Sequence, residues 1–235
     1  MRKILFVLTI AVVFVFTSCN DDDGYSLGKY WVSFGIYQGE NGSTEQIVLD
    51  NKDILVPVAA NFPGWASDFE NGDRILVNYT ILDEVLNTDG SVNSYYVKVN
   101  EVDNVLMKGI MDITEENADS IGNDPIIVSE YWMSDSLLNV KLKYWGYNEI
   151  HYLNLVKHPG DLTADDQPIQ LELRHNANED SQSIPYTAFV SFSLNSLRIA
   201  GLDSVSFQIT STDYDGEVYT EDGVFNYSDL ELPMP

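Results

Sequence analysis

Apolar and polar residues alternate with a period of two along most of the chain, which is typical of β-strands that bury one face. The clearest example spans residues 74–82, where one face carries Ile75, Val77, Tyr79 and Ile81. A second clear example is Ile169, Leu171, Leu173 and His175. Little of the chain shows the 3.6-residue period of helices, so we predict an all-β fold.

The first half of the chain predicts a small barrel. Residues 29–37 alternate so that Tyr30, Val32, Phe34 and Ile36 are expected to face the core, with the more polar set on the other face. Turn signals such as Asn71-Gly72 and Asp89-Gly90 separate this strand from later ones. About five strands in 29–113 suit an OB-like barrel.

Residues 113–125, ITEENADSIGNDP, are acidic, contain glycine and proline, and have no large aromatic residue. Such a change in composition is typical of a domain boundary, so we predict a linker at 114–125. Beyond it, about seven short strands in 126–231, with frequent turns, predict an antiparallel β-sandwich.

The N-terminus predicts a lipoprotein signal peptide at 1–18. Arg2 and Lys3 precede an apolar run at 4–16, which is too short to span a bilayer. The following Phe16-Thr17-Ser18-Cys19 resembles the lipobox of bacterial lipoproteins, so Cys19 is expected to carry lipid and anchor the chain to a membrane through a tether at 19–28. The alternative is an ordinary cleaved signal with an incidental cysteine. Since Cys19 is the only cysteine, no internal disulfide forms.

An acidic run follows this cysteine. Asn20, Asp21, Asp22 and Asp23 resemble the export signal that sends some Gram-negative lipoproteins to the outside of the outer membrane. The alternative is a solvated spacer on a lipoprotein that faces the periplasm. We expect an outer-membrane lipoprotein displayed at the cell surface.

The charge of the chain restricts its partners. The formal net charge is −25, and a phosphate-binding surface needs clustered Lys and Arg, so nucleic acid is excluded as a partner. Cations, cationic peptides and neutral glycans remain compatible with this charge. The hydrophobic fraction of 44% is ample for a packed core, so acidity here does not indicate disorder.

Motifs of catalysis are missing from the sequence. It contains no GxSxG, HExxH or GxxxxGK[ST] motif, and we expect no cofactor and no catalytic residues. His151, His158 and His175 are too scattered along the sequence for a local zinc motif, and His175 is expected to be a hydrogen-bonded structural group. We therefore expect no metal site, with one weak calcium candidate at a turn, formed by Asp213, Asp215 and Glu217.

Three aromatic residues are candidates for ligand binding. Trp31 and Tyr37 lie on the more polar face of the first strand, and Trp145 lies opposite an apolar strand face. Exposed rings stack on sugars or contact peptide side chains. The alternative is that these rings fill a domain interface or the second face of a sheet.

Several segments together resemble the NigD-like lipoproteins. These are GDRILVNYTIL at 72–82, the block WMSDSLLNV at 132–140, HYLNL at 151–155, LELRHN at 171–176 and VSFSL at 190–194. The resemblance covers essentially the whole mature chain and implies an N-terminal OB-like domain followed by a C-terminal β-sandwich. It implies no catalytic residues, because the family has no established activity. The family name comes from a member encoded with a bacteriocin.

We expect a non-enzymatic, lipid-anchored envelope protein that binds an unknown protein or glycan ligand. The alternative is an immunity protein that protects its producer against a bacteriocin. A third hypothesis is a hydrolase or an accessory to glycan processing, since paired acids at working distance would support glycosidic cleavage.

Overall fold

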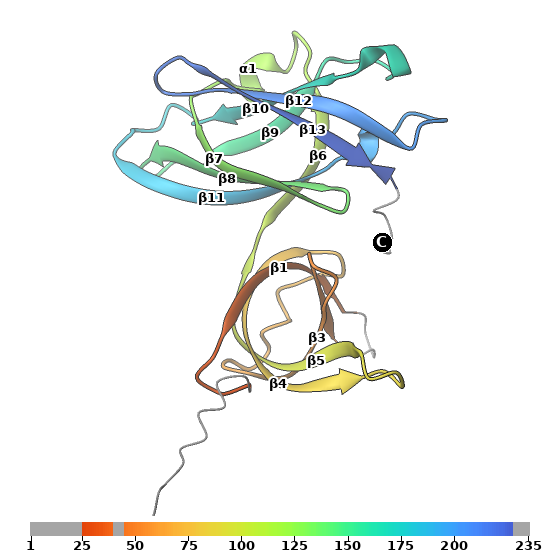
Figure 1. Cartoon of the computed structure of the whole chain (residues 1–235). Coiled ribbons are helices and arrows are strands. Elements are labelled where there is room, and N and C mark those ends of the chain that lie inside the picture. The colour runs from red at the N-terminus through yellow and green to blue at the C-terminus, as the bar shows by residue number, and fades with distance from the viewer. Residues whose placement is uncertain (1–24, 40–44, 228–235) are drawn as a thin grey trace, which may run out of the picture.

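The computed structural model describes residues 25–39 and 45–227, which form two β domains, one after the other along the chain (Figure 1). The signal peptide, Cys19 and the acidic run 20–23 lie outside the described residues. Within the described residues, no helix is long and apolar enough to cross a membrane.

The first domain is a closed five-stranded barrel. Its strands are β1 (Trp31–Gln38), β2 (Gln46–Leu49), β3 (Ile54–Ala60), β4 (Arg74–Leu86) and β5 (Val92–Asn104). The strand order is β1-β2-β3-β5-β4, and β4 closes the barrel by pairing with β1. Since β3 and β5 are parallel and the other pairs antiparallel, this is the OB topology, which confirms the predicted fold of the first half.

The predicted buried face of β1 is wrong. The barrel interior takes Gly35 and Tyr37, whereas Val32 is exposed and Phe34 points toward the second domain. Gly35 suits the interior because a Cβ there would lie 2.8 Å from Ile47 Cγ2. The apolar residues of β1 therefore serve the domain contact as well as the barrel, and alternation alone does not distinguish the two. On β4, the predicted inward set is buried.

The barrel ends earlier than predicted. Strand β6 (Leu106–Asp112) follows β5 after the single buried residue Val105, and it pairs with strands of the second domain. The predicted barrel range 29–113 is therefore too long. Periodicity did not reveal this, because β5 and β6 form one almost continuous extended segment that passes from one domain to the other (Figure 1).

The second domain is a sandwich made from one eight-stranded sheet that folds over on itself, in the order β13-β12-β10-β9-β6-β11-β8-β7. The middle strand β6 pairs with β11 up to Gly109 and with β9 from Ile110, so it passes from one layer to the other. The remaining elements are α1 (Ala118–Ile121), β7 (Ile127–Ser134), β8 (Leu137–Gly146), β9 (Tyr152–Lys157), the 3₁₀ turns η1 (Ala164–Asp166) and η2 (Asn195–Leu197), β10 (Ile169–Asn176), β11 (Ile184–Ser193), β12 (Ser204–Thr212) and β13 (Val218–Asn226).

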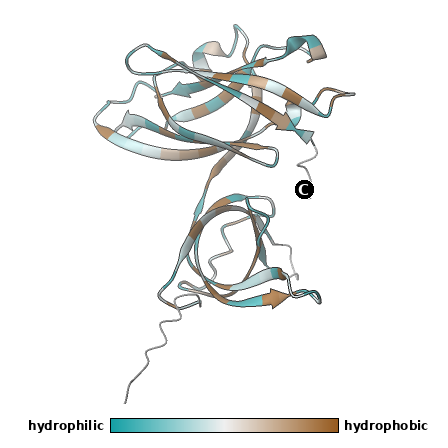
Figure 2. Ribbon diagram, in the orientation of Figure 1, coloured by the Kyte–Doolittle hydropathy of each residue, from teal (hydrophilic) through white to brown (hydrophobic). Residues whose placement is uncertain are grey.

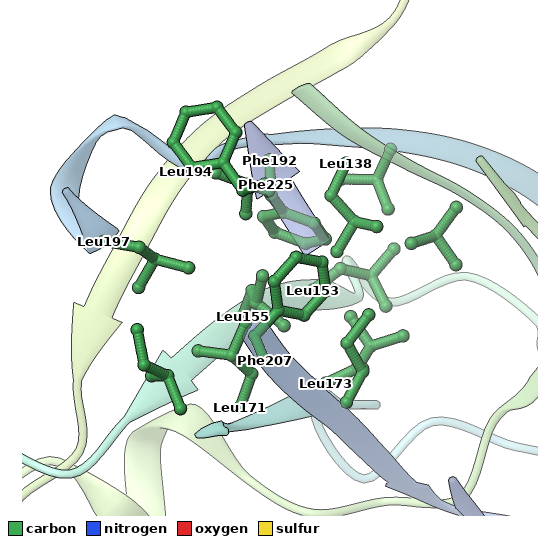
Figure 3. Close-up of a cluster of buried hydrophobic side chains, with 14 of the residues drawn as sticks. Leu138, Leu153, Leu155, Leu171, Leu173, Phe192, Leu194, Leu197, Phe207 and Phe225 are labelled. Atoms are coloured by element: carbon green, nitrogen blue, oxygen red, sulfur yellow. The ribbon is translucent and has the colours of Figure 1, made fainter. Parts of the chain in front are cut away.

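Apolar side chains from both layers fill the sandwich (Figure 3). Figure 2 shows hydrophobic residues on strands of both layers. Leu138 and Phe192 come from the β8–β11 layer and meet Leu155, Phe207 and Phe225 of the other layer, all fully buried. This confirms the predicted sandwich, and the predicted inward set of β10, including His175, is buried. The prediction that it is antiparallel is wrong for three pairs, β10–β12, β11–β6 and β6–β9, which are parallel.

The predicted linker 114–125 is part of the sandwich. Ile121 in α1 and Ile126 after it are buried, and Asp124 N–H donates to the carbonyl of His175. Gly122 is needed at this contact, because its φ is +74° and a Cβ would lie 2.8 Å from the same carbonyl. The acidic composition of this segment reflects its exposed residues and did not reveal the buried Ile121 or the buried Ile126 that follows the segment.

A buried arginine joins the two domains. Arg74 of the barrel is 1% exposed and forms a two-pronged ion pair with Asp50 of its own domain. Across the interface, its Nη2 donates to Asn139 Oδ1 (2.9 Å) and its Nε to Ser191 Oγ (3.3 Å). The guanidinium therefore has carboxylate, amide and hydroxyl partners, as a buried charge requires.

Aromatic rings surround this polar contact. The ring of Phe34 packs between Trp132 and Phe189 of the sandwich, with centroid distances of 5.2 and 5.1 Å, and Arg74 lies over its face. Lys52 of the barrel also pairs with Asp135 of the sandwich. These contacts make the two domains one packed unit.

Candidate functional site

Two histidines and an aspartate form a hydrogen-bonded chain at one end of the sandwich. His151 lies just before β9, His175 lies near the end of β10, and Asp180 lies in the β10–β11 loop. His151 Nδ1 is 2.8 Å from His175 Nε2, and His151 Nε2 is 3.1 Å from Asp180 Oδ2. His175 Nδ1 is 3.2 Å from the carbonyl oxygen of Pro125. We call this chain of groups the histidine relay.

The partners at the two ends of the relay determine the direction of its outer hydrogen bonds. The carbonyl of Pro125 and the ionised carboxylate of Asp180 can only accept hydrogen bonds. His175 Nδ1 must then donate to Pro125, and one proton lies between His151 Nδ1 and His175 Nε2. His151 Nε2 must also donate to Asp180. The histidine rings thus supply the donors at both ends of the relay.

Two pKa shifts agree with this arrangement. Burial, followed by the neighbouring His151, lowers the pKa of His175, so His175 is the neutral ring of the pair. Burial alone would raise the pKa of Asp180, but hydrogen bonds outweigh it and lower that pKa below its ordinary range. The donors are the backbone N–H groups of Tyr147, Asn148 and Ser181, together with the His151 ring.

The relay is built for packing and leaves no ring nitrogen for a substrate or metal. All four imidazole nitrogens have a partner within 3.2 Å, and the side chains of His151 and Asp180 are almost fully buried. Gly146 lets them approach, because a Cβ there would lie 2.8 Å from His151 Nε2 and 3.0 Å from Asp180 Oδ2. We interpret the relay as a rigid support for the residues around it.

Two stacked tyrosines cover the relay on the solvent side. The ring of Tyr144 packs against both histidine rings, and the ring of Tyr186 stacks on Tyr144 with a centroid distance of 5.6 Å. The Tyr186 hydroxyl also lies 3.4 Å from the carbonyl oxygen of Tyr147, to which it donates. The stacked rings thus connect the buried relay to the surface.

Four exposed side chains lie at this end, and we call them the tyrosine surface. Their exposed fractions are 60% for Tyr147, 67% for Ile150, 42% for Ile184 and 38% for Tyr186. Ile184 lies opposite Gly146 in the β8–β11 ladder, next to Tyr147, and Ile150 precedes His151. Large apolar side chains gathered on a rigid base are typical of a binding surface.

The loops beside the tyrosine surface are acidic. The β8–β9 loop carries Glu149, and the β10–β11 loop carries Glu179 next to Asp180. The two loops contain no lysine or arginine. A positively charged partner is therefore attracted to this end of the molecule, and an anionic one is repelled.

The three predicted aromatic residues differ in their burial. Tyr37 is 4% exposed and packs against Trp65 and Phe69 inside the barrel, so its prediction as a surface ring is wrong. Trp31 is half-buried and stacks on a core tyrosine of the barrel. Trp145 is half-buried against Tyr214. A ligand role for Trp31 or Trp145 stays a prediction.

The weak calcium candidate lies in the β12–β13 hairpin. Asp213 closes this turn, since its carbonyl accepts from Gly216 N–H and its N–H donates to the carbonyl of Glu217. Asp215 and Glu217 are exposed at the turn. Over the described ranges 25–39 and 45–227, no group of three or more His, Cys, Asp or Glu side chains is arranged to hold a metal.

The histidines are less scattered than the sequence indicated. His151 and His175 are in contact, and His175 is the hydrogen-bonded structural group that we predicted, whereas His158 is exposed after β9. The feature that could have predicted their contact is the antiparallel pairing of β9 and β10. This pairing places His175 opposite Leu153, and His151 lies two residues before Leu153, just beyond the strand end.

Family models match both domains. A model described as the NigD-like N-terminal OB domain matches residues 35–105, and one described as the NigD-like C-terminal β-sandwich domain matches residues 109–223. The chain belongs to the NigD-like family. The gap between the two matches agrees with a boundary near Val105. A comparison with curated proteins gave no match.

Solved structures share the whole NigD-like architecture. A toxin-related protein from Parabacteroides distasonis is 28% identical, with a TM-score of 0.70, and the likeness covers 86% of this chain and 96% of that one. A NigD-like immunity protein from Bacteroides caccae is 18% identical, with a TM-score of 0.62 and coverage of 84% and 93%. A protein from Bacteroides fragilis named as a lipoprotein is 11% identical, with a TM-score of 0.62 and coverage of 85% and 98%. The last two likenesses concern the fold alone.

Proposed function

We propose that this NigD-like chain is a non-enzymatic envelope lipoprotein that binds a protein partner through the end of its sandwich. The observation that carries the proposal is the tyrosine surface, in which Tyr147 and Ile150 are mostly exposed on top of a buried hydrogen-bonded relay. A rigid base lowers the entropy lost on binding, because the exposed side chains are already positioned.

A binding role fits the chemistry of this site better than catalysis. A general base needs a free nitrogen or oxygen within reach of its substrate, and every ring nitrogen of the relay is already bonded inside the protein. The exposed part of the site consists of tyrosine and isoleucine side chains, which supply contact area and hydrogen bonds.

Photo-crosslinking in the producing cell tests partner binding. A photoreactive amino acid at position 147 should give a discrete adduct with a partner in the envelope, and the same amino acid at Val58 on the barrel, 57% exposed, should not. Adding Ile150→Ser should lower the yield at position 147. Equal adducts at positions 147 and 58, or none at 147, would contradict the proposal.

The lipid anchor is part of the proposal and has its own test. Support comes from the lipobox-like residues before Cys19 and from the name of the Bacteroides fragilis structure. We expect Cys19→Ala to release the protein from the membrane fraction and the native chain to stay in it. Protease added to intact cells distinguishes surface display from a periplasm-facing anchor. An unchanged membrane fraction for Cys19→Ala would exclude lipidation.

Immunity is the second candidate function, and the name of the Bacteroides caccae structure favours it. In this case the partner is a secreted toxin made by the same cell. A deletion strain should then be killed by the culture medium of its parent, and the native chain should restore growth. Normal growth of the deletion strain in that medium would exclude immunity but not partner binding.

A further inference from the structure

Strand β11 has one side that the sheet covers only in part. It pairs with β8 along its whole length, from Ile184 opposite Gly146 to Ser193 opposite Leu137. On its other side it pairs with β6 only from Val190 to Ser193, because the chain upstream of Leu106 leaves for the barrel. Residues 184–189 therefore form an edge inside an otherwise continuous sheet, along the lower layer of the sandwich in Figure 1.

The backbone groups at this edge follow from the ladder. Trp145 donates its N–H to the Tyr214 hydroxyl, so its backbone groups point away from β11. Its partner Pro185 must then point its carbonyl away from β8, and so must Thr187 and Phe189, which follow with the period of two. Among the described residues, no hydrogen bond occupies the N–H groups of Thr187 and Phe189 on that side.

The two end strands of the sheet are protected. The end strands β13 and β7 carry Glu221, Asp222 and Glu130, and the Tyr131 hydroxyl donates to the carbonyl of Asp222. Residues 184–189 of β11, IPYTAF, carry no charge. Pro185 shortens the edge by removing one donor, and the Phe189 carbonyl accepts from Leu106 N–H in the first pair of the β6 ladder. The edge therefore offers the N–H groups of Thr187 and Phe189 and the carbonyls of Pro185 and Thr187.

We propose that the β11 edge takes an added strand from a positively charged partner, which would lie in line with β6. The inference rests on the proposed partner binding and defines how the partner docks. Alternate side chains of the added strand would contact Tyr186 and Ile184, which lie on the inner face of β11, while its backbone bonds to Thr187 and Phe189.

The negative charge of the chain favours a basic partner strand. The net charge of −25, with Glu149 and Glu179 in the adjacent loops, attracts a basic segment and disfavours a second copy of this chain. On the outer face, Lys143 lies opposite Thr187, and Lys141, which pairs with Glu130, lies opposite Phe189. The central residues of the added strand are therefore expected to be neutral, with the basic residues at its ends.

A designed peptide tests the edge without knowledge of the natural partner. The probe has alternating valine and threonine between paired terminal lysines, and its twin carries glutamates in place of the lysines. With the lysine peptide, amide exchange at Thr187 and Phe189 should slow by about tenfold or more, while Ala188, already bonded to β8, should change little. The glutamate twin should have no such effect.

Two substitutions at one position isolate the backbone contact. Thr187→Pro removes the outward N–H and keeps the ladder to β8, whereas Thr187→Val keeps both. We expect the lysine peptide to bind Thr187→Pro about tenfold or more weakly than Thr187→Val. If Thr187→Pro does not fold, the exchange measurement on the native chain decides.

Equal binding by the two Thr187 variants, or equal protection by both peptides or by neither, would overturn strand addition. If crosslinking at position 147 persists in Thr187→Pro, the proposed partner binding stands, and only strand addition at β11 is excluded. Loss of the adduct in Thr187→Pro but not in Thr187→Val would support both.

Discussion

Arg74 at the domain interface and the histidine relay each belong to a buried polar network. The two networks are shielded from solvent by different parts of the molecule. Arg74 is covered by the second domain, and its guanidinium bonds to Asp50, Asn139 and Ser191. The relay is covered by Tyr144 and Tyr186, which continue to solvent. In both networks each polar group has a partner inside the protein.

The interface around Arg74 is already filled by the second domain, whereas the surface above the relay is exposed to solvent. Around Arg74, the aromatic ring of Phe34 already packs against two rings of the sandwich. Above the relay, the ring of Tyr186 stacks on Tyr144, and both Tyr147 and Tyr186 are exposed to solvent. The first network therefore serves stability, and the second supports a surface on which a partner can dock.

The largest effect is expected from Arg74→Met. The change removes a buried charge and leaves Asn139 Oδ1 and Asp50 without their strongest donor, so the free energy of unfolding should fall by about 3–5 kcal/mol. Denaturant unfolding measures this loss. Arg198→Met, which removes an exposed arginine, serves as the matched control and should cost much less. Equal losses would show that the interface does not depend on Arg74.

A smaller loss is expected from Gly146→Ala at the relay. The added Cβ would lie within about 3 Å of His151 Nε2 and Asp180 Oδ2, so the relay must shift, at a cost of about 1–3 kcal/mol. Thermal unfolding and the histidine NMR signals report it. Gly109→Ala is the control, because nothing lies within 4 Å of its Cβ position. Unchanged histidine signals in Gly146→Ala would contradict the close packing.

Acid should weaken the relay. Because burial lowers the pKa of His175 below 6.5, the unfolded chain binds a proton between these two values that the folded chain does not. This stabilisation is complete above about pH 6.5 and declines as the pH falls toward the folded pKa. The free energy of unfolding should therefore fall as the pH decreases below about 6.5. His175→Gln should make this slope shallower, and an identical slope would exclude His175 as its source.

The smallest effect on stability is expected on the tyrosine surface. Tyr147 is 60% exposed, so Tyr147→Ser should change the free energy of unfolding by no more than about 0.5 kcal/mol. Equilibrium unfolding of the native chain and the variant measures this difference. A loss above about 2 kcal/mol would show that Tyr147 is a structural residue and remove it from the binding surface.

Alternation predicted the strands that have one buried face and failed where a strand serves two surfaces. The inward sets of β4 and β10 are buried as expected, because each faces a single core. On β1, Phe34 contacts the other domain, and no local pattern distinguishes that contact from barrel burial. For the same reason the apolar run 102–113 was assigned whole to the barrel, although β6 belongs to the sandwich.

The candidate site was predicted only in part. His175 was expected to be a structural group, but its partner His151 is 24 residues away along the chain, and their contact depends on the β9–β10 register. The exposure of Tyr147 and Ile150 comes from the loop around Gly146, which hydropathy does not describe. Asp180 was one acidic residue among 37, and only the fold selects it.

The position of β6 decides how the molecule can be divided and in which order it can form. A fragment that begins at residue 114 would lack the strand that joins β9 to β11, and we expect it to aggregate when expressed alone. During synthesis β6 emerges well before both of its neighbours, so its parallel pairings must wait for residues 155–157 and 190–193. The barrel, with its own closed hydrogen bonding, can fold first and then present β6 to the rest of the chain.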